Sequence, residues 1–240
     1  MSGHSKWKNI MHKKEKTDAQ RAKVFTKVGK EISIAVREGG PDPVSNTKLR
    51  DLIAKAKSLN VPNDNIKRII EKASGADGVV YEEYTYEGYG PAGIAMIVLT
   101  ATDKKNRTAG NIRHYFDKFG GNLGTQGCVS YMFTDKGLII INNEEGDYNE
   151  DEVMEAALEA GAADFQVDED IFEIYTEVED LQTVKEALEG KYTIESAEID
   201  KVPSSYITLE SEEDIEKIEN LLEALDDDDD VQNVYHNWDN

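Results

Sequence analysis

The sequence has little of what marks several common classes of protein. Its single cysteine, Cys128, cannot form a disulfide within the chain, which agrees with a reducing compartment. It has no run of 18 or more apolar residues, and its polar, basic start lacks the apolar stretch of a secretory signal. We therefore expect a cytoplasmic protein without a membrane partner.

Residue patterns typical of catalytic and cofactor sites are also missing. The four histidines, His4, His12, His114 and His236, are scattered without the spacing of metal ligands, and no nucleophile has a recognisable base beside it. The glycine-rich segment 120–127, GGNLGTQG, has no GK[ST] and follows an expected helix, so it predicts a helix-to-strand connection instead of a phosphate loop. We predict no enzyme activity, no metal, no cofactor and no small-molecule substrate.

Positive charge is nearly absent from the carboxyl-terminal part of the chain. Residues 143–240 hold 4 Lys and Arg against 34 Asp and Glu, whereas residues 1–75 hold 17 against 8, in a chain of net charge −22. The run Asp226–Asp230 lacks the alternating ligands of a calcium loop and is expected to be a solvated turn. This asymmetry predicts that a polyanionic partner meets the amino-terminal part, while the acidic regions could meet proteins.

The basic charge is organised along a predicted helix. Thr17 and Gln20 form a capping box that opens this helix, and Gly39 and Gly40 close it. Cations share one side of the helix, opposite an apolar side: Lys16, Lys23, Lys27, Lys30 and Arg37. We predict that this row binds nucleic-acid phosphates; the alternative is a solvated helix surface.

Two further segments are candidate nucleic-acid contacts. The segment ahead of the basic helix has no clear period and combines cations with aromatic rings: Lys6, Trp7, Lys8, His12, Lys13 and Lys14. The second segment lies where an expected strand passes into a helix that Asn106 could cap, so free backbone N–H groups and cations would converge there: Lys104, Lys105, Asn106 and Arg107. Ordinary helix capping with solvated lysines is the alternative for this segment.

Periodicity predicts an α+β fold in three domains. Residues 1–76 form a basic domain of three helices with an amino-terminal arm. Residues 135–202 follow the order βαββαβ, which is the ferredoxin-like arrangement. Residues 77–134 and 203–240, with expected strands at 94–101, 129–133, 206–209 and 231–235, are predicted to form a second βαββαβ domain that holds the first as an insertion.

Several motifs resemble the YebC family, whose members include bacterial proteins related to a mitochondrial translational activator. They are GHSKWKNI at 3–10, TYEGYGPAG at 85–93, NRT at 106–108, GGNLGTQGCVSYMF at 120–133 and DDDVQNVYHN at 228–237. The resemblance implies one helical domain followed by two α+β domains. It also implies a DNA-binding transcriptional regulator or a ribosome-associated translation factor that binds RNA, whereas a module that binds only proteins remains an alternative from charge alone.

Overall fold

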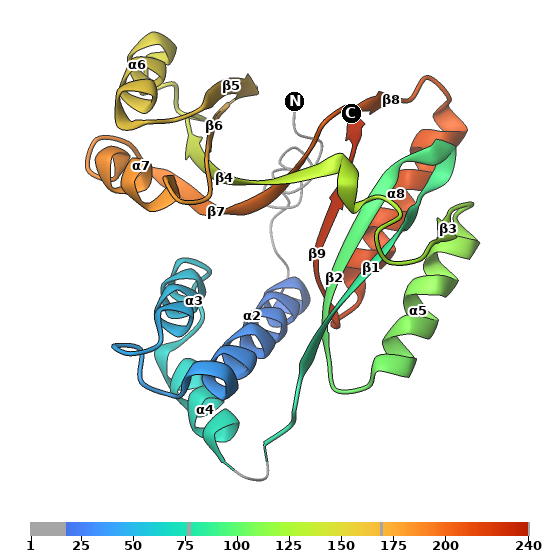
Figure 1. Ribbon diagram of the computed structural model, residues 1–240. Coiled ribbons are helices and arrows are strands. Elements are labelled where there is room, and N and C mark those ends of the chain that lie inside the picture. Colours follow the sequence, from blue (N-terminus) through green and yellow to red (C-terminus); the bar gives the residue numbers. More distant parts are fainter. Residues whose placement is uncertain (1–17, 76–77, 169, 240) are drawn as a thin grey trace. The chain divides into compact units, whose positions relative to one another are not determined.

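The computed structural model describes residues 18–75, 78–168 and 170–239 (Figure 1). These residues form seven α-helices and ten strands, which confirms the predicted α+β class. They fall into two compact units: residues 18–130 with 209–236, here called the host unit, and residues 131–208 with 237–239, here called the inserted unit. The three domain borders predicted at 76, 134 and 203 stay predictions.

The host unit begins with three helices: α2 (Asp18–Gly39), α3 (Thr47–Ser58) and α4 (Asn63–Ser74). Their buried apolar side chains, which include Ile32 and Leu49, form one core. The buried Asn46 caps α3 by accepting a hydrogen bond from the backbone N–H of Leu49, and its amide donates to the carbonyl oxygens of Ala35 and Gly40. One side chain therefore connects the end of α2 to the start of α3.

The host unit also contains a four-stranded antiparallel sheet in the order β3-β1-β2-β9. Its strands are β1 (Glu82–Tyr89), β2 (Ala95–Thr102), β3 (Asn122–Leu123) and β9 (Val231–His236), and a 3-10 turn at Pro91–Gly93 connects β1 to β2. Helices α5 (Lys105–Lys118) and α8 (Glu212–Asp227) pack beside each other in this unit (Figure 1). A side chain at Gly90 would overlap Met96 and crowd Ile218, so the turn passes close to this core.

Two predicted strands of this domain are wrong. Ser130–Met132 is a 3-10 turn, and Phe133 already belongs to the next strand, so 129–133 does not form the expected strand. The short β8 (Ile207–Thr208) pairs in parallel with β10 (Trp238–Asp239) and not with the host sheet. In the host sheet, β2 lies between β1, which precedes it in the chain, and β9.

The inserted unit has the predicted βαββαβ order. Its sheet order is β5-β6-β4-β7, with antiparallel pairs throughout. Its elements are β4 (Phe133–Asn142), α6 (Glu150–Ala160), β5 (Asp164–Asp168), β6 (Ile171–Thr176), α7 (Leu181–Leu188) and β7 (Ile194–Pro203). Side chains of α6 and α7 share a core with one face of the sheet. Within the described ranges, no helix is long and apolar enough to cross a membrane.

Candidate nucleic-acid interface

Three lysines of α2 face the acidic turn at the end of α8. They are three or four residues apart and therefore lie on one side of the helix. Each ammonium nitrogen is paired with a different carboxylate: Lys23 with Asp227 at 2.5 Å, Lys27 with Asp226 at 2.9 Å, and Lys30 with Asp230 at 2.6 Å. We call these three pairs the lysine–aspartate row.

Burial increases along the lysine–aspartate row. The exposed fraction of the side chain falls from 33% at Lys23 to 14% at Lys27 and 9% at Lys30. Asp230, the partner of Lys30, is 6% exposed. The first pair is thus close to water, while the last pair is inside the protein, where an ammonium group without its carboxylate would be unfavourable.

The lysines also compensate the negative end of α8. The carbonyl oxygens at the end of a helix carry partial negative charge, and Asp226 and Asp227 add two carboxylates to the last turn. Lys27 donates to the carbonyl oxygen of Asp226 at 2.7 Å, and Lys30 donates to that of Asp229 at 2.8 Å. Cations of α2 therefore make a run of five aspartates compatible with a helix C-terminus.

Asp230 connects α2 to the start of α5. Besides Lys30, it accepts hydrogen bonds from Arg107 at 2.7 Å and from the hydroxyl group of Thr108 at 2.7 Å. Burial alone would raise the pKa of Asp230, but the bonds from Lys30, Arg107 and Thr108 outweigh burial and lower this pKa to about 2. Asp230 is therefore ionised at neutral pH.

Asp228 makes a second connection to α5. Its carboxylate accepts hydrogen bonds from the amide of Asn111 and the hydroxyl group of Tyr115, both at 3.1 Å. Burial and the neighbouring Asp228 carboxylate raise the pKa of Tyr115 to about 12. Since Asp228 and Asp230 are both buried as whole residues, the expectation of a solvated turn is wrong for these two residues.

The segment at the start of α5 differs from its predicted form. Lys104, and not Asn106, is the N-cap residue, and no side chain caps this helix end. The guanidinium group of Arg107 is engaged by Asp103 and Asp230, and Lys105 Nζ lies 4.6 Å from the centroid of the Tyr84 ring. All four predicted residues, Lys104, Lys105, Asn106 and Arg107, are nevertheless exposed. Their contact with phosphate stays a prediction.

Helix α4 presents cations of a different kind. Lys67, Arg68 and Lys72 are exposed, and none of them has a carboxylate partner within the described part of the chain. Sequence periodicity places them outward, opposite Ile66 and Ile69, although they are not among the predicted contact residues. The signal that could have identified them as candidate contacts is a group of cations that faces away from the core of the helices.

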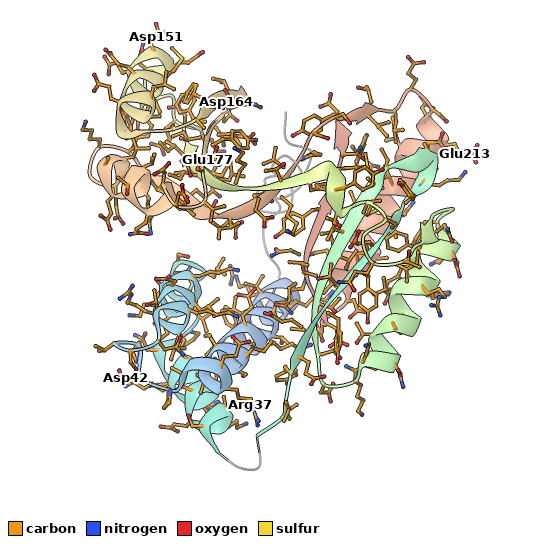
Figure 2. All side chains as sticks on the ribbon, in the orientation of Figure 1. Arg37, Asp42, Asp151, Asp164, Glu177 and Glu213 are labelled. Carbon is orange, nitrogen blue, oxygen red and sulfur yellow. The ribbon has the colours of Figure 1, made fainter. Side chains whose placement is uncertain are left out.

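Of the remaining predicted contacts, only Arg37 belongs to the described residues. Arg37, at the end of α2, is exposed and donates to the carbonyl oxygen of Gly78 at 2.7 Å (Figure 2). Lys6, Trp7, Lys8, His12, Lys13, Lys14 and Lys16 lie outside the described residues. In the inserted unit, Figure 2 shows the acidic side chains of Asp151, Asp164 and Glu177 on α6, β5 and the turn after β6.

The glycine-rich segment 120–127 is held by a buried glutamate. The carboxylate of Glu87 accepts backbone N–H groups from Gly127, Val129 and Ser130 at 2.8 to 3.0 Å. Burial alone would raise the pKa of Glu87, but these backbone hydrogen bonds outweigh it and lower the pKa. Because these N–H groups are engaged by Glu87, the segment acts as a helix-to-strand connection and offers them to no phosphate.

Other chemistry has little support in the described ranges. They contain no group of three or more histidine, cysteine, aspartate or glutamate side chains arranged to hold a metal ion. Cys128 is half-buried in the loop held by Glu87, and burial together with the Glu87 charge raises the pKa of its thiol. A raised pKa makes this thiol a poor nucleophile at neutral pH.

Comparisons with known proteins cover nearly the whole chain. A family model described as the TACO1/YebC protein N-terminal domain matches residues 5–76, and one described as the TACO1/YebC second and third domain matches residues 81–238. A relative from Acetivibrio thermocellus, named a probable transcriptional regulatory protein, is 55% identical over 240 residues and covers 99% of both chains. A relative of the same name from Lachnoclostridium phytofermentans is 54% identical over 241 residues, with full coverage of both chains.

A solved structure is similar as well. The crystal structure of a conserved hypothetical protein from Aquifex aeolicus matches with a TM-score of 0.84 and 46% sequence identity. The match covers 92% of this chain and 91% of that chain. The likeness therefore extends to the helices and to both sheets.

Proposed function

The chain belongs to the TACO1/YebC family, and from this premise we propose that it is a regulator of gene expression that binds nucleic acid through its amino-terminal helical part. The observation that carries the proposal is the set of exposed cations on α4, Lys67, Arg68 and Lys72, which have no carboxylate partner among the described residues. Such cations are available to phosphates without first breaking an ion pair.

The charge of the rest of the chain supports this orientation. Residues 143–240 carry 34 acidic against 4 basic side chains and repel a polyanion. A polyanion is therefore steered towards the helical part of the host unit. The exposed Lys104, Lys105 and Asn106, together with Arg37 and the amino-terminal segment, would extend the contact surface.

DNA is the first partner to test, because curated relatives are named probable transcriptional regulatory proteins. Ribosomal RNA is the second candidate. The cations of α4 suit phosphates, which DNA and RNA both present. A regulator that recognises phosphates and RNA shape would act in translation through the same surface.

The test compares binding of the full chain to promoter-length duplex DNA and to purified ribosomes over a range of salt concentrations. We expect the triple variant Lys67→Gln, Arg68→Gln, Lys72→Gln to lose affinity and to lower the slope of log K against log salt by about 0.9 per phosphate contact removed from DNA. The matched control replaces Lys185, Lys191 and Lys217 by Gln, which removes the same charge from regions outside the helical part. Equal affinity of the two variants and wild type for both partners would refute the proposed surface.

A further inference from the structure

A hollow lies between α2 and α4 on the helical part of the host unit. Its lining comes from Phe25 and Thr26 of α2, from Val61 between α3 and α4, and from four residues of α4: Asn65, Arg68, Ile69 and Lys72. Its volume of about 280 Å³ is just below the range of about 300 to 1,000 Å³ that is typical of small-molecule sites. The hollow therefore has room for one small chemical group and not for a whole coenzyme.

The lining of the hollow combines two chemical characters. Phe25 and Ile69 are half-buried and contribute an aromatic and an aliphatic side chain to the lining. Arg68 and Lys72 are exposed at the same hollow, and no acidic side chain of the described residues lines it. A ligand that fits must be flat and apolar at one part and anionic at another.

Polar groups at the hollow add hydrogen-bonding capacity. The carboxamide group of Asn65 has no hydrogen-bond partner within the described ranges. The hydroxyl group of Thr26 donates to the carbonyl oxygen of Ala22 at 2.9 Å, so its oxygen can still accept a hydrogen bond. Asn65 and Thr26 can therefore pair with the polar edge of a flat ring.

From this lining we infer that the hollow binds one unpaired nucleotide of a single-stranded nucleic acid. The base would stack on Phe25, and the flanking phosphates would contact Arg68 and Lys72. A base in an intact duplex is covered by its neighbours and cannot enter, whereas a single strand presents its bases and phosphates together. The inference rests on the proposed function and specifies the nucleic acid as single-stranded.

The experiment measures fluorescence anisotropy of the full chain with a labelled single-stranded oligonucleotide and with the duplex of the same sequence. We expect tighter binding of the single strand. Phe25→Leu keeps an apolar side chain but removes the stacking surface, so it should weaken single-strand binding roughly 5- to 150-fold and duplex binding far less. A thermal melt checks that this variant is folded, because Phe25 also packs against the helical core.

Two double variants that change only charge test the inference even if the Phe25→Leu variant does not fold. Arg68→Gln with Lys72→Gln removes two charges at the hollow, whereas Lys57→Gln with Lys67→Gln removes two exposed charges of α3 and α4 that do not line it. We expect only the first pair to abolish the preference for the single strand. Equal losses for both pairs on both forms of nucleic acid would overturn the inference and leave general phosphate binding standing.

Other outcomes separate the inference from the proposed function. Binding of neither single strand nor duplex would overturn both. Competition by a nucleoside monophosphate as strong as competition by the unlabelled oligonucleotide would overturn the single-strand inference in favour of a free nucleotide. Displacement by an acidic peptide at the same concentration as by the oligonucleotide would assign the hollow to a protein partner instead.

Discussion

The cations of α2 and those of α4 belong to one small helical cluster but have opposite surroundings. Lys23, Lys27 and Lys30 of α2 are each paired with a carboxylate of the acidic turn. Lys67 and Arg68 of α4 are exposed and lack such a partner within the described ranges. Two stretches that look equally basic in the sequence thus differ in whether their charge is available to another molecule.

The difference has a simple physical origin. A carboxylate of the same chain is present at a high effective concentration, so it competes with any phosphate in solution for the same ammonium group. The competition is strongest where the pair is buried, as at Lys30 and Asp230, because water no longer screens the attraction. The lysines of the lysine–aspartate row therefore connect α2 to the segment next to the sheet of the host unit, and they are not free to bind the phosphates of a partner.

The largest effect is expected from breaking the buried pair of the lysine–aspartate row. Lys30→Met leaves Asp230 buried without its ammonium partner and should reduce the free energy of unfolding by about 3 kcal/mol. Arg107 remains as a partner, so the loss should stay at the lower end of the range for such pairs. Urea denaturation measures it. Lys67→Met is the control, with an expected change within about 0.5 kcal/mol; equal changes in both variants would contradict the comparison.

Acid should weaken the lysine–aspartate row in a defined window. The pKa of Asp230 is about 2 in the folded protein against an ordinary value of 3.8, so its contribution is complete above about pH 4 and is lost as the pH falls towards 2. A shift of this size corresponds to roughly 2 kcal/mol. The measurement is the difference in free energy of unfolding between wild type and Asp230→Asn as a function of pH. This difference should shrink below pH 4, and a constant difference down to pH 2 would contradict the assignment.

Releasing the exposed part of the row should increase binding. Asp226→Asn with Asp227→Asn removes the carboxylate partners of Lys27 and Lys23. Lys23 then becomes available to phosphates, whereas Lys27 is 14% exposed and keeps its hydrogen bond to the backbone carbonyl oxygen of Asp226. Affinity for nucleic acid should rise several-fold and the salt dependence should steepen by about one phosphate contact. Stability should change by less than about 1 kcal/mol, because the two carboxylates are largely solvated.

The control for this release is Glu219→Gln with Glu223→Gln. These exposed residues belong to the same helix, α8, and give the same change in net charge without touching the lysine–aspartate row. If the control raised affinity as much as the aspartate variant, net charge alone would explain the gain.

The smallest effect concerns a cation held by a ring instead of a carboxylate. Lys105 lies over the Tyr84 ring, and Tyr84→Leu should cost about 0.5 to 1 kcal/mol of stability by removing that contact. Since the ammonium group of Lys105 is exposed in either case, nucleic-acid affinity should change less than twofold. Thermal melting measures the stability, and the same anisotropy titration measures the affinity. A large gain in affinity would mean that the Tyr84 ring keeps Lys105 from phosphates, as the aspartates do for the lysines of α2.

Local signals in the sequence predicted much of the fold. The hydrophobic periodicity of residues 135–202 predicted the order βαββαβ. The helices and strands of the structure follow one another in that order. The helices of the amino-terminal part were predicted from turn residues such as Pro62 and from the helical spacing of apolar residues. These features depend on residues a few positions apart, which a sequence displays directly.

Features set by distant partners could not be predicted in this way. The two-residue strand β3 has no period of its own and exists because β1 lies beside it. The burial of Asp230 depends on Lys30, two hundred positions earlier, and on the start of α5. The charge pattern of the sequence singled out both members of this pair, but it predicted that Lys30 binds nucleic acid and that Asp230 lies in a solvated turn.

Glu87 has a consequence for how the chain tolerates its insertion. It fixes the backbone up to Ser130, the last residue before the chain leaves the host unit, and Ser211 caps α8 soon after the chain returns. The departing and returning segments are therefore anchored by groups of the host unit itself. The chain crosses between the units a third time after His236, where the host strand β9 ends and pairs with β2. Opening of the inserted sheet can therefore leave the host unit folded only if it stops at all three crossings.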